Sequence, residues 1–253
     1  MKLMTYNIFN GAPDRLDLIE KTVKEENPNY LSINEANTFS NYDNKILKEF
    51  AQKTNFPYFE IALSGDGDYH VAAFSKSPFK QIHQITPLMR ACIVGLVETE
   101  IGPLSIAGFH LTPYTEEARV GEVKSILRYQ MQFENRILMG DMNSLSKRDN
   151  YDEAIVKHFN KTQLDKYTKQ GKLQFAVTKS IENAGYVDSS VQLKKNNQTT
   201  VPTQIGLDQS HGNMRLDYIF VSENLAPKVK EYNVIKNEIT KKASDHFPIT
   251  VTL

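Results

Sequence analysis

The segment Ser244–Leu253, SDHFPITVTL, places an acid and an imidazole just before an alternating apolar run, Ile249–Leu253. Alternation with a period of two residues is typical of a strand with one buried face. Asp245 and His246 are therefore expected at one end of a strand. One Asp-His pair in a loop is weak evidence for a site, so its meaning depends on how the other predicted strands end.

Other short apolar runs along the chain also carry a polar residue at or near one end. These runs and their polar neighbours are Lys2–Tyr6 with Asn7, Tyr30–Ile33 with Glu35, Leu104–Phe109 with His110, Ile137–Met139 with Asp141 and Asn143, and Asp217–Val221, which Asp217 opens. Carboxylates, amides and imidazoles that recur in this way at strand ends indicate a single shared site.

Helical spacing of apolar residues predicts helices over 14–24, 43–53 and 115–133, with further candidates over 151–159 and 172–182. Residues 188–215 read as a long polar loop, a kind of segment that is usually functional or mobile. Neighbouring strands with inserted helices predict an α+β fold, with two face-to-face, mainly antiparallel β-sheets flanked by helices. Because the candidate site residues run from Asn7 to His246, we expect one domain over 1–253.

The composition limits the class of protein. Lys and Arg together number 30, as do Asp and Glu, so the formal net charge is zero. A protein that coats nucleic acid without specificity needs a basic footprint, which this balance does not supply. The single cysteine, Cys92, lies in an apolar run and excludes an intrachain disulfide. No apolar segment approaches the length of a membrane helix, so a soluble, cytoplasmic protein is expected.

The polar residues of the shared site favour one kind of chemistry. The set contains four carboxylates, two amides and two imidazoles: Glu35, Asp141, Asp217, Asp245, Asn7, Asn143, His110 and His246. Carboxylate and amide oxygens are hard ligands that favour Mg²⁺, Mn²⁺ or Ca²⁺. The imidazoles then remain for phosphate contacts and proton transfer. This inventory suits attack by water on a phosphoester.

Residues next to these runs are candidates for contacts with a substrate. His211 and Arg215 lie in or beside the long polar loop, which could reach over the site. Tyr114 and Arg119 follow His110 closely, and an arginine can grip a phosphate, although a place on a helix surface is the more ordinary role for Arg119.

Six strings in order now allow a comparison with known families. They are Thr5-Tyr6-Asn7-Ile8, Glu35, Gly108-Phe109-His110-Leu111, Gly140-Asp141-Met142-Asn143-Ser144, Arg215–Phe220 and Ser244-Asp245-His246. Together they resemble the motifs of the endonuclease/exonuclease/phosphatase superfamily, which has the DNase I-like fold. The resemblance spans residues 3–253. It implies a four-layer α/β sandwich and a Mg²⁺- or Mn²⁺-dependent phosphoester hydrolase.

The resemblance also implies roles for the metal-facing residues. Glu35 resembles the principal metal ligand, with Asn7 and Asp245 completing the polar shell. Asp141 resembles the residue that orients or deprotonates the attacking water. Asn143 resembles a residue that holds a phosphate oxygen or positions Asp141.

The remaining implied roles concern the phosphate. His246 resembles the histidine that contacts the scissile phosphate. Asp217 resembles its partner, which would bond the far ring nitrogen and fix the tautomer. His110 resembles a second phosphate-facing histidine, either a hydrogen-bond donor or a general acid.

Departures from known branches leave the substrate open. Asn7 has no Asp two residues later, and His110 stands where abasic-site endonucleases carry Tyr. Asn34 replaces the usual Gln before the metal-binding Glu. The chain has no Trp, which separates it from inositol-polyphosphate phosphatases. The prediction is a phosphodiesterase or nuclease acting on nucleic acid or a nucleotide-like diester. A phosphomonoesterase or lipid-headgroup phosphodiesterase is the alternative, and an inactive binding module is a third.

Overall fold

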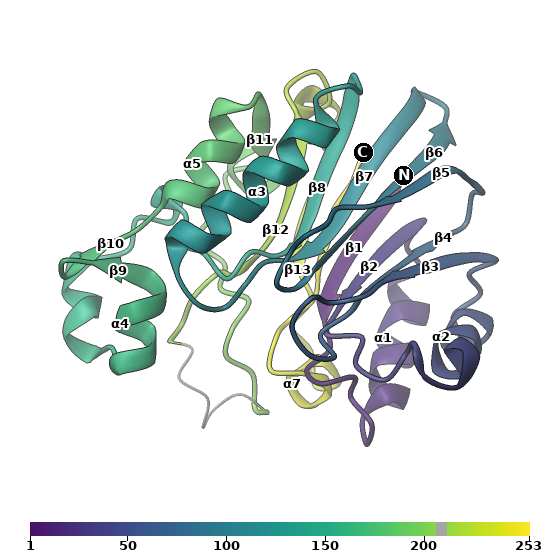
Figure 1. Ribbon diagram of the computed structural model, residues 1–253, viewed down its shortest axis with the longest axis horizontal. Helices are drawn as coiled ribbons and strands as arrows, with labels where there is room; N and C mark the ends of the chain where they lie inside the picture. Colours follow the sequence, from purple (N-terminus) through teal and green to yellow (C-terminus); the bar gives the residue numbers. More distant parts are fainter. Residues whose placement is uncertain (206–211) are drawn as a thin grey trace.

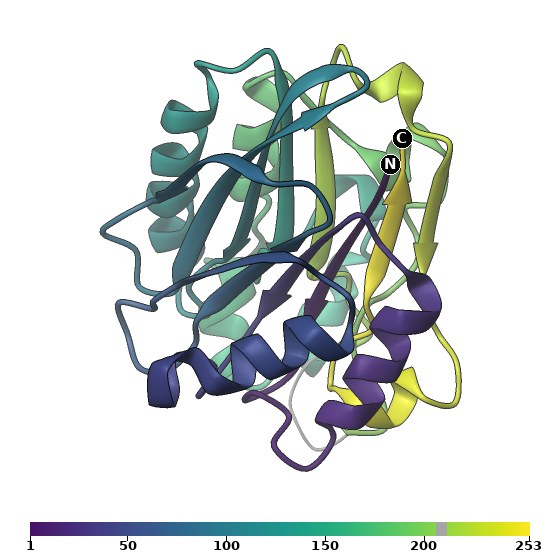
Figure 2. The same ribbon diagram turned by 90° about the vertical axis from the view of Figure 1, so that its right-hand side faces the viewer.

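The computed structural model describes residues 1–205 and 212–253. Two six-stranded sheets pack face to face, and helices cover their outer faces (Figures 1 and 2). The α+β fold class predicted from the sequence is confirmed.

Each sheet is built around one parallel pair of strands, flanked by antiparallel pairs. The first sheet has the spatial order β13 (Glu231–Val234), β14 (Ile249–Thr252), β1 (Lys2–Asn7), β2 (Tyr30–Asn34), β4 (Val71–Ser75) and β3 (Tyr58–Ala62). The second has the order β11 (Tyr186–Asp188), β12 (Asp217–Ser222), β8 (Asn135–Asp141), β7 (Gly102–His110), β6 (Ala91–Thr99) and β5 (Phe79–Gln84).

A crossover helix joins the two strands of each parallel pair, as parallel pairing requires. In the first sheet α1 connects β1 to β2, and in the second α3 connects β7 to β8. The helices are α1 (Leu16–Glu26), α2 (Asn41–Lys53), α3 (Glu116–Gln130), α4 (Lys161–Tyr167), α5 (Ala176–Asn183), α6 (Ser189–Gln192) and α7 (Thr240–Ala243). Short 3₁₀ turns lie at η1 (Lys147–Asp149), η2 (Glu153–His158) and η3 (Ala226–Lys228), and β9 (Thr168–Lys169) pairs with β10 (Lys172–Leu173).

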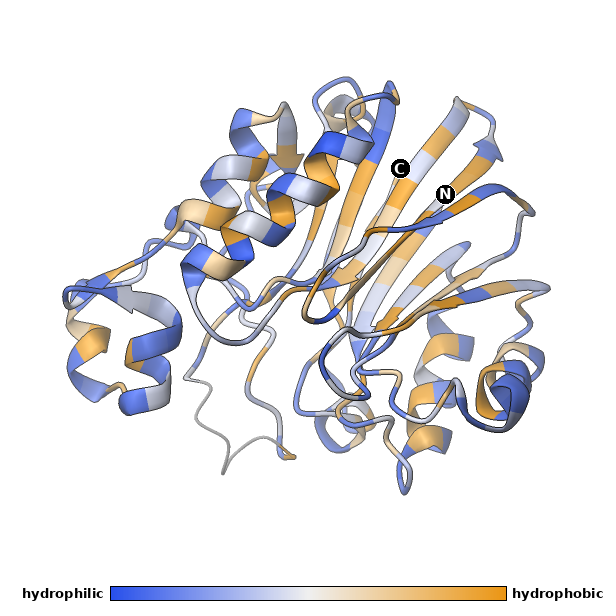
Figure 3. Cartoon of the chain, viewed as in Figure 1, coloured by the Kyte–Doolittle hydropathy of each residue, from blue (hydrophilic) through white to orange (hydrophobic). Residues whose placement is uncertain are grey.

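Alternation along each strand divides the apolar residues between separate cores. Inward positions such as Leu3, Ile106 and Ile219 form the cluster between the sheets. Outward positions pack under the helices, where Tyr6 belongs to the same cluster as Ile19 of α1. Burying a large aliphatic or aromatic side chain contributes roughly 1.5–3 kcal/mol, so these layers hold the sheets together. Figure 3 shows the matching pattern of apolar strands and mixed helices.

The same alternation decides where the polar residues point. On β1, Leu3 faces the inner cluster and Met4 the outer one, so Asn7 falls on the inward side. His110 shares its parity with Ile106, and Asp217 shares its parity with Ile219. The strand ends therefore deliver their polar side chains into the space between the sheets.

Several predicted element boundaries move in the structure. The clearest expected helix, 115–133, is α3, and Thr115 caps it by accepting a hydrogen bond from the Ala118 backbone nitrogen at 3.3 Å. The helix predicted over 151–159 is the 3₁₀ turn η2. The prediction over 172–182 is wrong at its start, because Lys172–Leu173 pairs as β10 and the helix begins at Ala176.

The segment 188–215 is more structured, where described, than its polar sequence predicted. It contains α6, and Val201 forms an isolated bridge with Met214. Val201 and Met214 are both fully buried. Among the described helices none is both long enough and apolar enough to cross a bilayer.

Candidate active site

The central strands of both sheets end at the same side of the sandwich and bring three of the predicted site residues into register. His110 ends β7 and lies beside Asp141, the last residue of β8. Asp217 opens the antiparallel strand β12 and lies on the other side of Asp141. Asp141 and Asp217, which are 76 positions apart in the chain, are thus adjacent across one sheet.

Asn34, at the end of β2, ties the first sheet to this edge of the second. Its Oδ1 accepts a hydrogen bond from the Asp141 backbone nitrogen at 3.1 Å, and its Nδ2 donates to the Phe109 carbonyl at 2.7 Å. The sheets also approach closely one layer deeper, where an added Cβ on Gly108 would lie 2.4 Å from Ser32 Oγ. Small residues there let the polar ends of the two sheets meet.

Asp141 is the centre of the hydrogen-bond network. Its Oδ2 accepts from Asn7 Nδ2 at 3.0 Å, and its Oδ1 accepts from the Asn143 backbone nitrogen at 2.8 Å. The turn that allows this needs Gly140, which has a φ of 149° and where a Cβ would lie 1.8 Å from the Phe109 carbonyl oxygen. The Gly-Asp-Met-Asn string therefore needs glycine for its backbone conformation, and it also supplies the side chains of Asp141 and Asn143.

His246 is held by an acid on one side and faces Asp141 on the other. Its Nδ1 lies 2.8 Å from Asp217 Oδ2, and its Nε2 lies 3.8 Å from Asp141 Oδ2. Burial lowers the pKa of His246, but the charges of Asp217, Asp245 and Asp141 outweigh it and raise that pKa to about 10. His246 is therefore an imidazolium at neutral pH. Burial raises the pKa of Asp141, yet the charges of His246 and His110 hold it below its ordinary value.

His110 differs from His246 in its protonation. Asn143 Nδ2 lies 3.0 Å from His110 Nε2 and also donates to the Leu111 carbonyl at 2.9 Å, so Nε2 is the acceptor of that bond. Burial lowers the pKa of His110 to about 4. A neutral His110 that accepts from Asn143 is suited to orienting the amide, which does not favour the general-acid role considered from the sequence.

Glu35 lies beside Asn7 in a strained turn after β2. Asn7 Nδ2 donates to its Oε1 at 3.2 Å, and the Asn10 backbone nitrogen donates to its Oε2 at 2.9 Å. Its φ is 57°, a left-handed conformation that is uncommon for a residue other than glycine. Burial, and after it the charge of Asp245, raise the pKa of the Glu35 carboxyl. A bound cation would offset the repulsion between the Glu35 and Asp245 carboxylates, so this pair is suited to binding one.

Two sets of residues here could hold a metal ion. Asp141, Asp217 and His246 have ligand atoms within 4.8 Å of one another. The short His246–Asp217 contact in that group is a hydrogen bond to an imidazolium, which has no lone pair to offer on the bonded nitrogen. The oxygen-rich set of Glu35, Asn7 and Asp245 therefore fits a hard divalent ion better, with Asp141 next to it.

The candidate substrate contacts lie in different environments. Arg119 and Arg215 are 0% and 1% exposed, and both guanidinium groups are bonded inside the protein. The structure thus places these two arginines in internal ion pairs rather than on the surface of a cleft. Tyr114 is half exposed and donates to Asp66 Oδ2 at 3.0 Å. His211 lies outside the described residues.

Sequence reasoning missed two residues beside this site. In the sequence Asn34 stands out only as the residue that replaces Gln, although its amide bridges the sheets. Lys166 of α4 is 6% exposed, and the charge of Asp141 acts on its ammonium. The position of Asn34 directly before Glu35 was a usable signal, whereas nothing in the local sequence marks Lys166.

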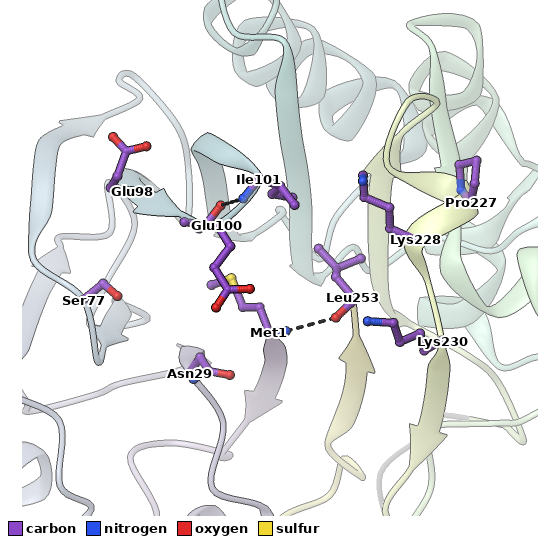
Figure 4. A pocket seen from close by; sticks show the side chains of 11 residues that line it. Met1, Asn29, Ser77, Glu98, Glu100, Ile101, Pro227, Lys228, Lys230 and Leu253 are labelled. Carbon is purple, nitrogen blue, oxygen red and sulfur yellow. Dashed lines mark hydrogen bonds between the residues drawn. The ribbon is translucent and has the colours of Figure 1, made fainter.

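A cavity of about 800 Å³ opens at the opposite end of the sandwich (Figure 4). Met1 and Leu253 lie in it, with Glu98 and Glu100 on one side and Lys228 and Lys230 on the other. It is separated from Asp141 by the length of the central strands, so it has no part in the chemistry described above.

A family model described as "Endonuclease/Exonuclease/phosphatase family" matches residues 4–246. The chain belongs to this family. The match contains every residue from Asn7 to His246 that the structure gathers around Asp141. No curated protein matches the sequence.

Solved structures agree with this family assignment. An AP endonuclease from Archaeoglobus fulgidus has a TM-score of 0.76 at 15% identity, with 100% of this chain and 99% of that one covered. The 3′ phosphatase NExo from Neisseria, bound to a product DNA hairpin, has a TM-score of 0.72 at 18% identity, with 100% and 99% covered. A family protein from Leptotrichia buccalis has a TM-score of 0.71 at 22% identity, with 100% and 98% covered. At these identities the likeness establishes the fold.

Proposed function

We propose that this family member is a Mg²⁺- or Mn²⁺-dependent phosphodiesterase that hydrolyses nucleic acid or a nucleotide-like diester. The observation that carries the proposal is the position of the Asp141 carboxylate. It lies between the imidazolium of His246, 3.8 Å away, and the amide of Asn7, 3.0 Å away. A carboxylate held ionised beside a cation can orient water next to a group that binds phosphate.

The residues divide the hydrolytic step between them. Asp141 orients the water and accepts its proton as the bond from the water oxygen to phosphorus forms. The bond from phosphorus to the leaving oxygen breaks, and that oxygen takes a proton from solvent. His246 contacts the phosphate and stabilises the negative charge that develops, while Asp217 keeps the ring oriented through the 2.8 Å contact. His110 orients Asn143, whose backbone nitrogen holds Asp141.

Glu35, Asn7 and Asp245 are the residues that would hold the divalent ion. The Ser244 hydroxyl supports this set by donating to the Asn7 carbonyl at 2.6 Å, which fixes the loop before Asp245 against β1. When bound, the ion would neutralise charge on the phosphate.

The choice of substrate class rests on the fold neighbours and on the charge balance. NExo was solved with DNA, and the Archaeoglobus protein is an AP endonuclease, which supports a nucleic-acid substrate. NExo is also a 3′ phosphatase, so a phosphomonoesterase that uses the same centre is the second candidate. A lipid-headgroup phosphodiesterase is a further candidate, because a net charge of zero does not favour nucleic acid over lipid as the substrate.

A substrate panel tests the proposal. Single- and double-stranded DNA, RNA, free nucleotides, phosphoinositides and sphingomyelin should each be incubated with the protein and Mg²⁺ or Mn²⁺. We expect cleavage of a nucleic acid or nucleotide diester, and a loss of about 10²–10⁴-fold in Asp141→Asn. The exposed Asp165→Asn on α4 is the control and should keep wild-type turnover. Equal rates for wild type and Asp141→Asn would remove the mechanism, and release of phosphate from monoesters alone would favour the second candidate.

A further inference from the structure

Lys166 is a buried lysine whose ammonium has neither a hydrogen bond nor an ion pair among the described residues. The residue is 6% exposed and is the second-last residue of the helix α4, one position before Tyr167. Its Nζ lies 5.2 Å from the centre of the Tyr167 ring, and within residues 1–205 and 212–253 no hydrogen bond or ion pair reaches that ammonium. Lysines are almost never buried without a partner, so the position needs an explanation.

The backbone of Lys166 is anchored to the loop that carries Asn143. Arg119 Nη2 donates to the Lys166 carbonyl, and Arg119 Nε donates to Ser144 Oγ at 2.7 Å. Tyr167 packs in the same apolar cluster as Leu145. Contacts with Ser144 and Leu145, the two residues that follow Asn143, thus hold the end of α4 against the Asp141 loop.

The charges of the active site act on the Lys166 ammonium. Burial lowers the pKa of Lys166 to about 8, while Asp141, and after it Glu35 and Asp245, oppose that effect. Lys166 in turn helps to lower the pKa of Asp141. The ammonium is therefore within electrostatic reach of the carboxylates on which the proposed hydrolysis depends, although its helix carries none of the family strings.

We propose that Lys166 is a catalytic residue whose ammonium contacts a non-bridging oxygen of the scissile phosphate. This inference rests on the proposed phosphoester hydrolysis. An ammonium without a partner in the free protein has its hydrogen-bonding capacity available for an anion, and a charge-assisted bond in a desolvated site is stronger than one in water. Burying this ammonium without an ion pair destabilises the free protein, and a bound phosphate would supply the missing negative charge.

The test compares three variants with bis-p-nitrophenyl phosphate and Mg²⁺ or Mn²⁺. Lys166→Met removes the charge and keeps the aliphatic length, Lys166→Arg restores a cation, and Lys161→Met on the exposed side of α4 is the matched control. We expect kcat/KM to fall about 10²-fold in Lys166→Met, mainly through kcat, and to recover in part in Lys166→Arg. Wild-type kcat/KM in Lys166→Met would overturn the proposal.

Stability and phosphate binding separate this role from a structural one. Removing an unpaired buried charge should leave Tm unchanged or raise it, whereas removing a structural lysine should lower it. Calorimetry with inorganic phosphate in the presence of Mg²⁺ should show about tenfold weaker binding in Lys166→Met than in Lys161→Met. If Lys166→Met does not fold, Lys166→Gln takes its place in both measurements. If the wild-type protein hydrolyses none of the substrates, the proposed function fails. The contact between Lys166 and phosphate is tested separately, and it is rejected if Lys166→Met and Lys161→Met bind phosphate equally well.

Discussion

The side-chain amide of Asn34 accepts a hydrogen bond from the backbone nitrogen of Asp141 across the interface between the two sheets, at 3.1 Å. The same amide donates to the Phe109 carbonyl at 2.7 Å, so it satisfies two buried backbone groups of the second sheet. The position of the proposed catalytic carboxylate is therefore set by a residue on the opposite sheet. Stability and activity should both depend on that amide.

Asn34→Ala should lower the free energy of unfolding by about 2–5 kcal/mol, because it leaves a buried N–H and a buried C=O unsatisfied. Urea unfolding monitored by circular dichroism measures the change. Asn29, exposed at the other end of β2, accepts a hydrogen bond from the Lys2 backbone nitrogen and provides the control. Asn29→Ala should cost about 1 kcal/mol or less, and a similar loss in both variants would contradict the role given to Asn34.

The residues around Asp141 show what the sequence could reveal. The ends of the apolar runs were sufficient to mark Asn7, His110 and Asp217 as candidates, and the Gly140–Ser144 string supplied Asp141 and Asn143. These signals are local, since they depend on strand period and turn chemistry. The convergence of the candidate residues on one end of the sandwich follows from the parallel pairs at the centre of both sheets.

Local patterns could not reveal partners that depend on long-range packing. Arg119 and Arg215 look like phosphate ligands in the sequence, but the folded chain surrounds them with distant partners. Arg119 pairs with Glu116 of its own helix and also bonds Ser144 and the Lys166 carbonyl. Arg215 meets Asp149, which is 66 positions away along the chain. Lys166 lies in a short helix without a motif, so its closeness to Asp141 also appears only in three dimensions. The roles given to the individual site residues stay predictions.

Glu35→Gln should weaken Mg²⁺ binding about tenfold or more, because it removes the charge of the carboxylate that shares the oxygen-rich site with Asn7 and Asp245. Isothermal titration calorimetry with MgCl₂ and MnCl₂ measures the affinity. Glu60 is exposed on β3 of the same sheet, and Glu60→Gln should bind as wild type does. Unchanged affinity in Glu35→Gln, with weaker binding in Asp217→Asn, would move the site to the Asp141–Asp217–His246 group.

His110 should make the folded state sensitive to acid. Burial lowers its pKa to about 4, from an ordinary value of 6.5. A histidine with a depressed pKa contributes stability above pH 6.5 that is lost as the pH falls toward 4, and a shift of this size corresponds to about 3 kcal/mol. Urea unfolding between pH 7 and pH 4, with a chelator present, should show a smaller loss in His110→Gln than in wild type. Parallel pH profiles would show that His110 does not contribute.

Arg215 should matter for stability and not as a ligand for substrate. Its guanidinium bonds Asp149 at 2.8 Å and Asp188 at 2.7 Å, and all three side chains are almost fully buried. Arg215→Met would strand two buried carboxylates and should lower the free energy of unfolding by about 3–5 kcal/mol. Thermal and urea unfolding measure this loss, and Arg148→Met, which breaks an exposed pair with Glu182, should cost about 1 kcal/mol or less.

Kinetic measurements on folded Arg215→Met distinguish this stabilising role from a role in binding substrate. At a temperature where the variant is fully folded, its KM for the best substrate of the panel should stay within about twofold of wild type, because a group bonded on both sides inside the protein has no donor left to exchange for a phosphate. A KM increase of about tenfold, with stability close to that of wild type, would instead return Arg215 to the substrate-binding role that its place before Asp217 suggests in the sequence.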